Sequence, residues 1–327
     1  MNRLRKTLGD EFNRLVLIAV LVFLLMTALR PSSFLSKANI VSMAFQIPEM
    51  GILTLAITFA FITGGMDLSL VGISNLSAIC AGLFISNSLD GTESGFVVVP
   101  MIAVSILISL LIGVLCGAFN GFLISKMRIN PILATLGSMQ LYSGIAMILT
   151  QGSSVVGLPE EYAFFGQSSL LGIPVPLIIF ILCATVVHYQ LSKTRFGIKL
   201  KLIGTNEVAA KYSGIDVAVS KIRSYVCGGV LAAIAGIVMM SRVNSAKADF
   251  ASSYTMQTIL IAILGGVSPS GGKGTVKGVF IAACILQFLS SGFNMMRMSQ
   301  YAKELVWGAL LIAMISIMVF GERKEST

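Results

Sequence analysis

The sequence predicts an all-α integral membrane protein with about ten transmembrane helices, some of them broken or re-entrant. Apolar residues make up 56% of the 327 residues, only 11% are charged, and the mean hydropathy is +0.91. A soluble globular domain carries about 25% charged residues, so this composition places the chain in membrane lipid. The length suffices for roughly ten helices of about 20 residues each and leaves little for a soluble domain. We therefore expect a single transmembrane domain over residues 1–327.

Hydropathy places the predicted spans at residues 15–29, 44–63, 68–86, 97–125, 132–150, 174–191, 224–241, 255–267, 276–292 and 304–320. If the N-terminus lies in the cytoplasm, seventeen of the 23 Lys and Arg residues fall in segments on the cytoplasmic side and six on the outer side. Cytoplasmic loops of membrane proteins carry such an excess of basic residues. We therefore predict that both termini are cytoplasmic.

Two predicted spans have irregular ends. Residues 255–267 are too few to cross about 30 Å as a helix, and they continue into a glycine-rich stretch over residues 265–274. A second break, at residues 63–69, contains Asp67. Irregular backbone at membrane depth must face protein or a water-filled cavity, so both segments are expected to do so. Asp67 is interpreted first as the cap of the following helix and second as a gate or substrate contact.

The longest polar interruption, residues 191–223, carries seven Lys and Arg residues and is predicted to be a cytoplasmic loop. Thr205 or Asn206 can cap a helix start, Glu207 suits its positive end and Lys211 its negative end, and Gly214 suits the stop. The loop therefore predicts a short exposed helix, which a membrane protein would offer to a soluble partner.

Several function classes are disfavoured by the sequence. Gly272-Lys273 is not a phosphate-binding loop, because Val267 stands where that motif requires glycine and Gly274 where it requires Ser or Thr. No grouping of His, Cys, Asp or Glu has the spacing of a metal or catalytic site, so we expect neither an enzyme nor a bound cofactor. The net charge of +9 is spread over loops and is read as topological rather than as a nucleic-acid surface.

Uncharged polar residues inside the spans are candidates for a translocation path. Amides are costly in lipid unless they bond to protein or face water, and they suit hydroxyl-rich solutes such as sugars. The alternative is bonding between helices, which we expect for most of them. Two carboxylates, Glu49 and Asp67, come near span interiors, and both are expected at span ends. The candidate path residues are Asp67, Asn75, Asn120, Thr135, Gln140, Gln257 and Asn294.

Glycines at four-residue spacing mark one face of the fourth span. Gly113, Gly117 and Gly121 share this face, which predicts close packing against another helix.

Several separated motifs, taken in order, resemble the ribose-type monosaccharide permeases, the membrane subunits of bacterial ABC importers. The resemblance covers nearly the whole chain. It is carried by Gly65-Met66-Asp67-Leu68-Ser69, Asn120-Gly121, Asn130–Gly137, Thr194–Gly197, Gly204–Glu207 with Ala209, Ala210 and Gly214, and the segment Leu264–Gly274. One departure concerns Tyr254, which is followed by Thr255-Met256-Gln257 where the family often has two acids. This departure leaves the substrate open.

The resemblance implies an ABC importer permease fold in the bacterial cytoplasmic (inner) membrane. It implies a cytoplasmic ATPase subunit that uses ATP, a periplasmic or extracytoplasmic solute-binding protein, and a second permease subunit, identical or not. The residues that would couple to the ATPase are Gly204, Thr205, Asn206, Glu207, Ala209, Ala210 and Gly214. The implied substrate is a monosaccharide or a similar small polar solute. Alternatives are a nucleoside, a furanosyl signalling molecule or a branched-chain amino acid as substrate, or a secondary carrier working alone.

Overall fold

The structure is a computed structural model that describes residues 11–88 and 95–325. In these residues, nine helices are long and apolar enough to cross a membrane. They are α2 (Glu11–Leu29), α4 (Lys37–Ile62), α5 (Leu70–Ser88), α6 (Gly95–Ser125), α7 (Pro131–Thr150), α9 (Val175–Lys193), α12 (Val217–Val243), α14 (Val276–Met295) and α15 (Gln300–Glu325). The prediction of an all-α membrane protein is confirmed, and nine of the ten predicted spans coincide with these helices.

The tenth predicted span, residues 255–267, forms only the short helix α13 (Tyr254–Leu264). Its end at Gly265 is followed by irregular backbone up to Thr275, so the predicted broken element is confirmed. The other short elements are α3 (Pro31–Phe34), η1 (Glu160–Ala163), α8 (Phe164–Gln167), α10 (Arg195–Thr205) and α11 (Glu207–Tyr212).

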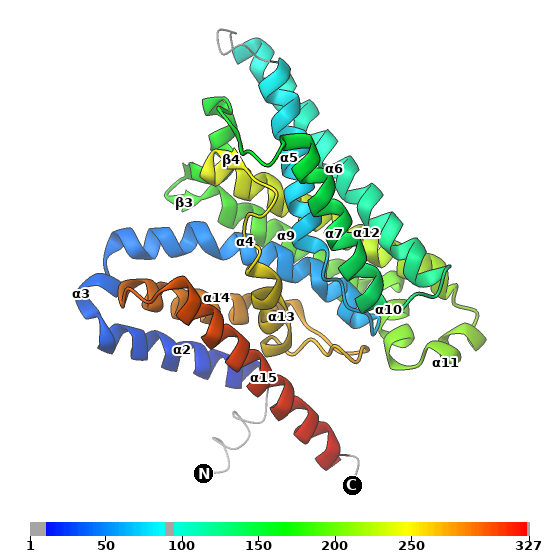
Figure 1. The fold of residues 1–327 in the computed structure, drawn as a ribbon. Helices are drawn as coiled ribbons and strands as arrows, with labels where there is room; N and C mark the ends of the chain where they lie inside the picture. The colour runs from blue at the N-terminus through cyan, green and yellow to red at the C-terminus, as the bar shows by residue number, and fades with distance from the viewer. Residues whose placement is uncertain (1–10, 89–94, 326–327) are drawn as a thin grey trace.

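The core forms where α12 packs against α4, α5 and α6. In Figure 1, α2, α14 and α15 lie to the left and below α4, while α5, α6, α7 and α12 rise to the right of it. The half of α4 that follows Pro48 is buried throughout, because helices cover it on all sides. The start of α2 and the end of α15 both point toward the bottom of the view. Their cytoplasmic location stays a prediction.

Four two-residue strands in the described residues form two pairs, one between loops far apart in the sequence and one within a single loop. Strand β1 (Val155–Val156) pairs with β4 (Ser245–Ala246) in antiparallel register, and β2 (Ser169–Leu170) pairs with β3 (Ile173–Pro174). The first pair fastens the segment that follows α12 to the segment that follows α7. This pairing positions the loop that lines the cavity described below.

The glycine face of α6 is in backbone contact with α12. A Cβ atom on Gly113 would lie 2.4 Å from the Gly229 carbonyl oxygen, and one on Gly117 would lie 2.4 Å from the Tyr225 carbonyl oxygen. Only glycine allows two helix backbones to approach so closely, so the close packing predicted for this face is confirmed.

We expect Gly117→Ala to destabilise the protein, because the added methyl group meets a backbone oxygen that cannot rotate away. Overpacking of this kind costs about 1–3 kcal/mol, and the measurement is the apparent midpoint of thermal unfolding in detergent. The matched control is Gly144→Ala on α7, where a Cβ atom meets nothing within 4 Å. Equal midpoints for the two variants would contradict this account of the α6–α12 contact.

Candidate functional site

The predicted exposed helix forms as α11. The Asn206 side chain caps it by accepting a hydrogen bond from the Ala209 N–H at 2.9 Å, while the Thr205 hydroxyl bonds back into α10 at the Lys201 carbonyl. Asn206 is therefore the cap, which resolves the two alternatives. Glu207 lies in the first turn, and Gly214 follows the helix with φ of +79°. The capped, glycine-terminated helix was predictable because all its signals are local.

The start of α11 is connected to the membrane domain by an ion pair. Glu207 forms an ion pair with Lys221 of α12 at 2.7 Å, which holds the start of α11 against the next span. Val208 and Tyr212 project outward, and their exposed fractions are 65% and 89%. An exposed apolar and aromatic surface on a short rigid helix suits contact with another protein.

Gly204, in the last turn of α10, contacts the glycine-rich loop. A Cβ atom on Gly204 would lie 2.0 Å from the Ile62 carbonyl oxygen and 2.4 Å from the Gly272 nitrogen. The Gly272 N–H also donates to the Ile62 carbonyl at 3.0 Å. Gly271 and Gly272 have φ of +94° and +77°, a conformation that favours glycine. The junction, the glycine-rich loop and the end of α4 therefore meet through backbone atoms.

The break between α4 and α5 is closed by a buried polar network. One Asp67 carboxylate oxygen accepts from the Ser69 N–H at 3.0 Å and from the Ser69 hydroxyl at 2.7 Å. The Asn120 amide donates to the Ser69 hydroxyl oxygen at 2.7 Å, and the Tyr142 hydroxyl donates to the Asn120 carbonyl oxygen at 3.0 Å. The Thr135 hydroxyl lies 3.3 Å from the Met66 carbonyl oxygen. Asp67 thus satisfies the N–H of Ser69, just before α5, and both its interpretation as a helix cap and its role in translocation stay predictions.

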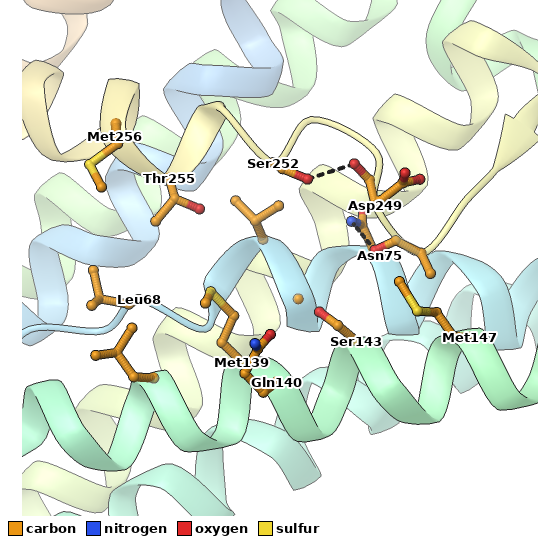
Figure 2. A pocket seen from close by; sticks show the side chains of 14 residues that line it. Leu68, Asn75, Met139, Gln140, Ser143, Met147, Asp249, Ser252, Thr255 and Met256 are labelled. Atoms are coloured by element: carbon orange, nitrogen blue, oxygen red, sulfur yellow. Dashed lines mark hydrogen bonds between the residues drawn. The ribbon is translucent and has the colours of Figure 1, made fainter. Parts of the chain in front are cut away.

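A cavity of about 410 Å³ lies between α5, α7 and the segment that leads from β4 into α13. Figure 2 shows Gln140 and Ser143 of α7 facing Asn75 of α5 and the loop that carries Asp249 and Ser252. The cavity is lined by Leu68, Val71, Gly72, Asn75, Leu136, Met139, Gln140, Ser143, Met147, Ala248, Asp249, Ser252, Thr255 and Met256. Asn75 and Gln140 are thus the two candidate path residues that the fold brings together in this cavity.

The cavity offers several hydrogen-bonding groups to a guest. The Asn75 amide donates to the carbonyl oxygens of Ala248 and Phe250, at 3.0 and 2.9 Å, so its own oxygen is left to accept. In the described part of the chain, the side chains of Gln140 and Ser143 make no hydrogen bond. The one acidic or basic side chain among the lining residues is that of Asp249, which is paired with Lys247 at 3.1 Å.

Two other candidate path residues lie outside this lining. Gln257 is buried in α13, and its side-chain oxygen has no hydrogen-bond partner among the described residues. Asn294 lies near the end of α14 and accepts from the Lys303 ammonium group. The translocation role of Gln257 and Asn294 stays a prediction.

The expectation that Glu49 lies at a span end is wrong. Glu49 is fully buried in the middle of α4, because α4 begins at Lys37, seven residues before the predicted span, after its Ser36 cap. Its carboxylate is compensated by Arg242 and Tyr254, which lie far away in the sequence. No local pattern signals such a pairing, so sequence reasoning missed it.

Comparison with known proteins decides the family. Residues 39–315 match the model of the branched-chain amino acid transport system permease component. The chain belongs to this permease family. It is 34% identical over 312 residues to the ribose import permease protein RbsC of Bacillus subtilis. The aligned residues cover 94% of this chain and 92% of the relative. It is 35% identical to the autoinducer 2 import system permease protein LsrD of Photorhabdus temperata, over 80% of this chain and 78% of the relative.

A solved structure supports the same fold. An ABC transporter in an inward-facing conformation superimposes with a TM-score of 0.56 at 14% identity, covering 95% of this chain and 98% of that chain. The protein is therefore a multi-pass permease subunit of an ABC importer in the inner membrane, as predicted. Its relatives are transport subunits rather than enzymes, and the family implies an ATPase and a binding protein as partners.

We expect Gly204→Ala to loosen the attachment of α11, because its methyl group would meet the backbone of Ile62 and Gly272. The measurement is hydrogen–deuterium exchange of the amides of residues 204–213, which should speed up by about tenfold as the junction opens locally. The control is Gly137→Ala on α7, where a Cβ atom meets nothing within 4 Å. Unchanged exchange in Gly204→Ala would show that the backbone contact does not hold the junction.

Proposed function

We propose that this permease moves a neutral, hydroxyl-rich solute of monosaccharide size into the cytoplasm, through a path that includes the cavity beside Asn75 and Gln140. A separate ATPase supplies the energy, a binding protein delivers the solute from outside, and a second permease subunit completes the path. The observation that carries the substrate proposal is the chemistry of the cavity lining. The relatives named for ribose and autoinducer 2 support the same substrate class.

The cavity suits a neutral polar solute better than an amino acid. Amide and hydroxyl groups of Asn75, Gln140 and Ser143 can exchange hydrogen bonds with sugar hydroxyls, while Val71 and Leu136 can pack on the apolar face of a sugar ring. A cationic side chain commonly binds the carboxylate of a zwitterionic amino acid, and the described lining residues include none. A branched-chain amino acid is therefore the weaker candidate despite the family description.

Helix α11 is the proposed coupling element for the ATPase. Helix α11 is held in place by its cap, by its ion pair to α12 and by the contact of the preceding Gly204 with the glycine-rich loop. Val208 and Tyr212 are exposed and can contact the ATPase. Movement of α11 would then reach α12 directly through Lys221. Alternating access would follow as the spans reorient around the cavity.

A carrier that works alone is the second candidate. Such carriers usually place ionisable groups at the substrate site to couple ions to transport. In the cavity, the one carboxylate, Asp249, is about half exposed and is already paired with Lys247. This geometry favours the ATP-driven importer.

We expect proteoliposomes that hold the permease with its co-purified ATPase to accumulate labelled ribose when ATP and the binding protein are supplied. Ser143→Trp should reduce uptake to below about a tenth of the parent rate, because the indole fills the cavity. The control, Val186→Trp, alters an exposed position on α9 and should transport normally. Leucine uptake in place of ribose would overturn the substrate class, and gradient-driven uptake by the permease alone would favour the carrier.

We expect Glu207→Lys to abolish ATP-driven uptake while membrane insertion persists, because it reverses the charge in the first turn of α11. The variant also sets two ammonium groups against each other at Lys221. The double variant Glu207→Lys with Lys221→Glu restores that ion pair, so continued loss of uptake would locate the defect in the contact with the ATPase. Full recovery in the double variant would assign Glu207 a purely local role.

A further inference from the structure

A buried carboxylate in the middle of α4 binds two residues at opposite ends of one loop. Glu49 has no exposed side-chain surface. The Arg242 guanidinium donates to both carboxylate oxygens, through Nε and, at 3.1 Å, through Nη2. The Tyr254 hydroxyl donates to one of the same oxygens at 3.1 Å. Arg242 lies in the last turn of α12, and Tyr254 is the first residue of α13.

The loop between Arg242 and Tyr254 forms one wall of the cavity. Ala248, Asp249 and Ser252 line the cavity from this loop, and Thr255 and Met256 continue the wall into α13. Glu49 is not among the lining residues. The carboxylate therefore fixes both ends of the wall from behind, without itself facing a guest.

The Arg242 end of this loop is anchored independently of Glu49. The Gln167 amide donates to the Arg242 carbonyl oxygen at 3.1 Å, and the Ser241 hydroxyl donates to the Tyr162 carbonyl oxygen. The middle of the loop is held by β1 and by the Asn75 amide. At the start of α13, the described residues form hydrogen bonds within the loop and within α13, and the bond from Tyr254 to Glu49 is the one that reaches another helix. The Tyr254–Glu49 bond is therefore the described hydrogen bond that ties this end to another helix, while α13 itself packs against α4, α14 and α15.

A bidentate pair between Arg and a carboxylate fixes direction as well as distance, because both partners are planar. A buried ion pair adds little net stability relative to apolar packing, and its better-supported use is to specify one arrangement. The burial of Glu49 thus points to a geometric role rather than to a gain in stability.

We propose that Glu49, Arg242 and Tyr254 form a positioning cluster that sets where the cavity wall of residues 243–256 lies, and thereby which solutes the permease accepts. Only the claim about which solutes are accepted rests on the proposed function of the cavity. Its first part, the placement of the wall, is testable without any transport.

The test is the rate at which a water-soluble maleimide labels a cysteine at position 252, in a background whose five native cysteines are replaced by alanine. We expect Glu49→Gln to change this rate by about tenfold, because the wall leaves its fixed position. Tyr254→Phe removes one hydroxyl with little change of shape and should give a smaller change in the same direction. Arg242→Lys, which keeps the charge, should lie between Glu49→Gln and the parent.

A cysteine at position 208, on the exposed face of α11, is the matched control, and its labelling should be the same in all four proteins. If Glu49→Gln fails to fold, as judged by its thermal unfolding in detergent, Tyr254→Phe decides the question. Parental labelling at position 252 in Tyr254→Phe and in every folded variant would overturn the cluster's role in placing the wall.

The consequence for selectivity is read separately, as the ratio of uptake rates for ribose and for the larger sugar glucose. We expect this ratio to fall in Tyr254→Phe while the overall uptake of ribose persists. An unchanged ratio together with altered labelling would overturn the selectivity part alone. Absence of sugar uptake in the parent would instead refute the proposed function and leave the labelling result standing.

Discussion

The hydrocarbon interior of a membrane supplies no hydrogen bonds, and this constraint organises the polar residues of the permease. The polar groups at each break in a helix must bond to protein or to water in a cavity. The network of Asp67, Ser69 and Asn120 closes the break before α5. The bond from Gly272 to Ile62 helps to close the break after α13. Where polar groups are instead left without partners, as Gln140 and Ser143 are in the described cavity, they remain available to a hydroxyl-rich guest.

Features set by local chemistry could be predicted from the sequence. The long apolar runs gave nine spans, and the shortness of residues 255–267 revealed the broken α13. The cap at Asn206 and the glycine spacing on α6 were also predictable, because each depends on neighbours within a few residues or on one helix face. Helix α10 was not predicted. It is set by packing of Leu200 and Ile203 into the interior, which a basic, mostly polar segment does not reveal.

The candidate site could be predicted only in part. Asn75 and Gln140 are predicted path residues that the fold brings to one cavity, and their role in translocation stays a prediction. Their neighbours Asp249 and Ser252 come from a loop whose path depends on the pairing of β1 with β4 and on Glu49. Arg242 and Glu49 are 193 positions apart in the sequence, so no periodicity or spacing connects them. The sequence thus identified polar candidates, and tertiary contacts decided which of them share a site.

The junction at Gly204 has a mechanical consequence. Side chains at most interfaces between helices can change rotamer and so absorb part of a small shift. At Gly204 and Gly271 the facing atoms belong to the backbone, and no rotamer exists between them. A displacement of Gly204 is therefore passed to the end of α4 without being absorbed by side-chain rearrangement. The backbone contact thus makes the connection between α10 and α4 stiff, which would suit force transmission if α11 is the coupling element proposed above.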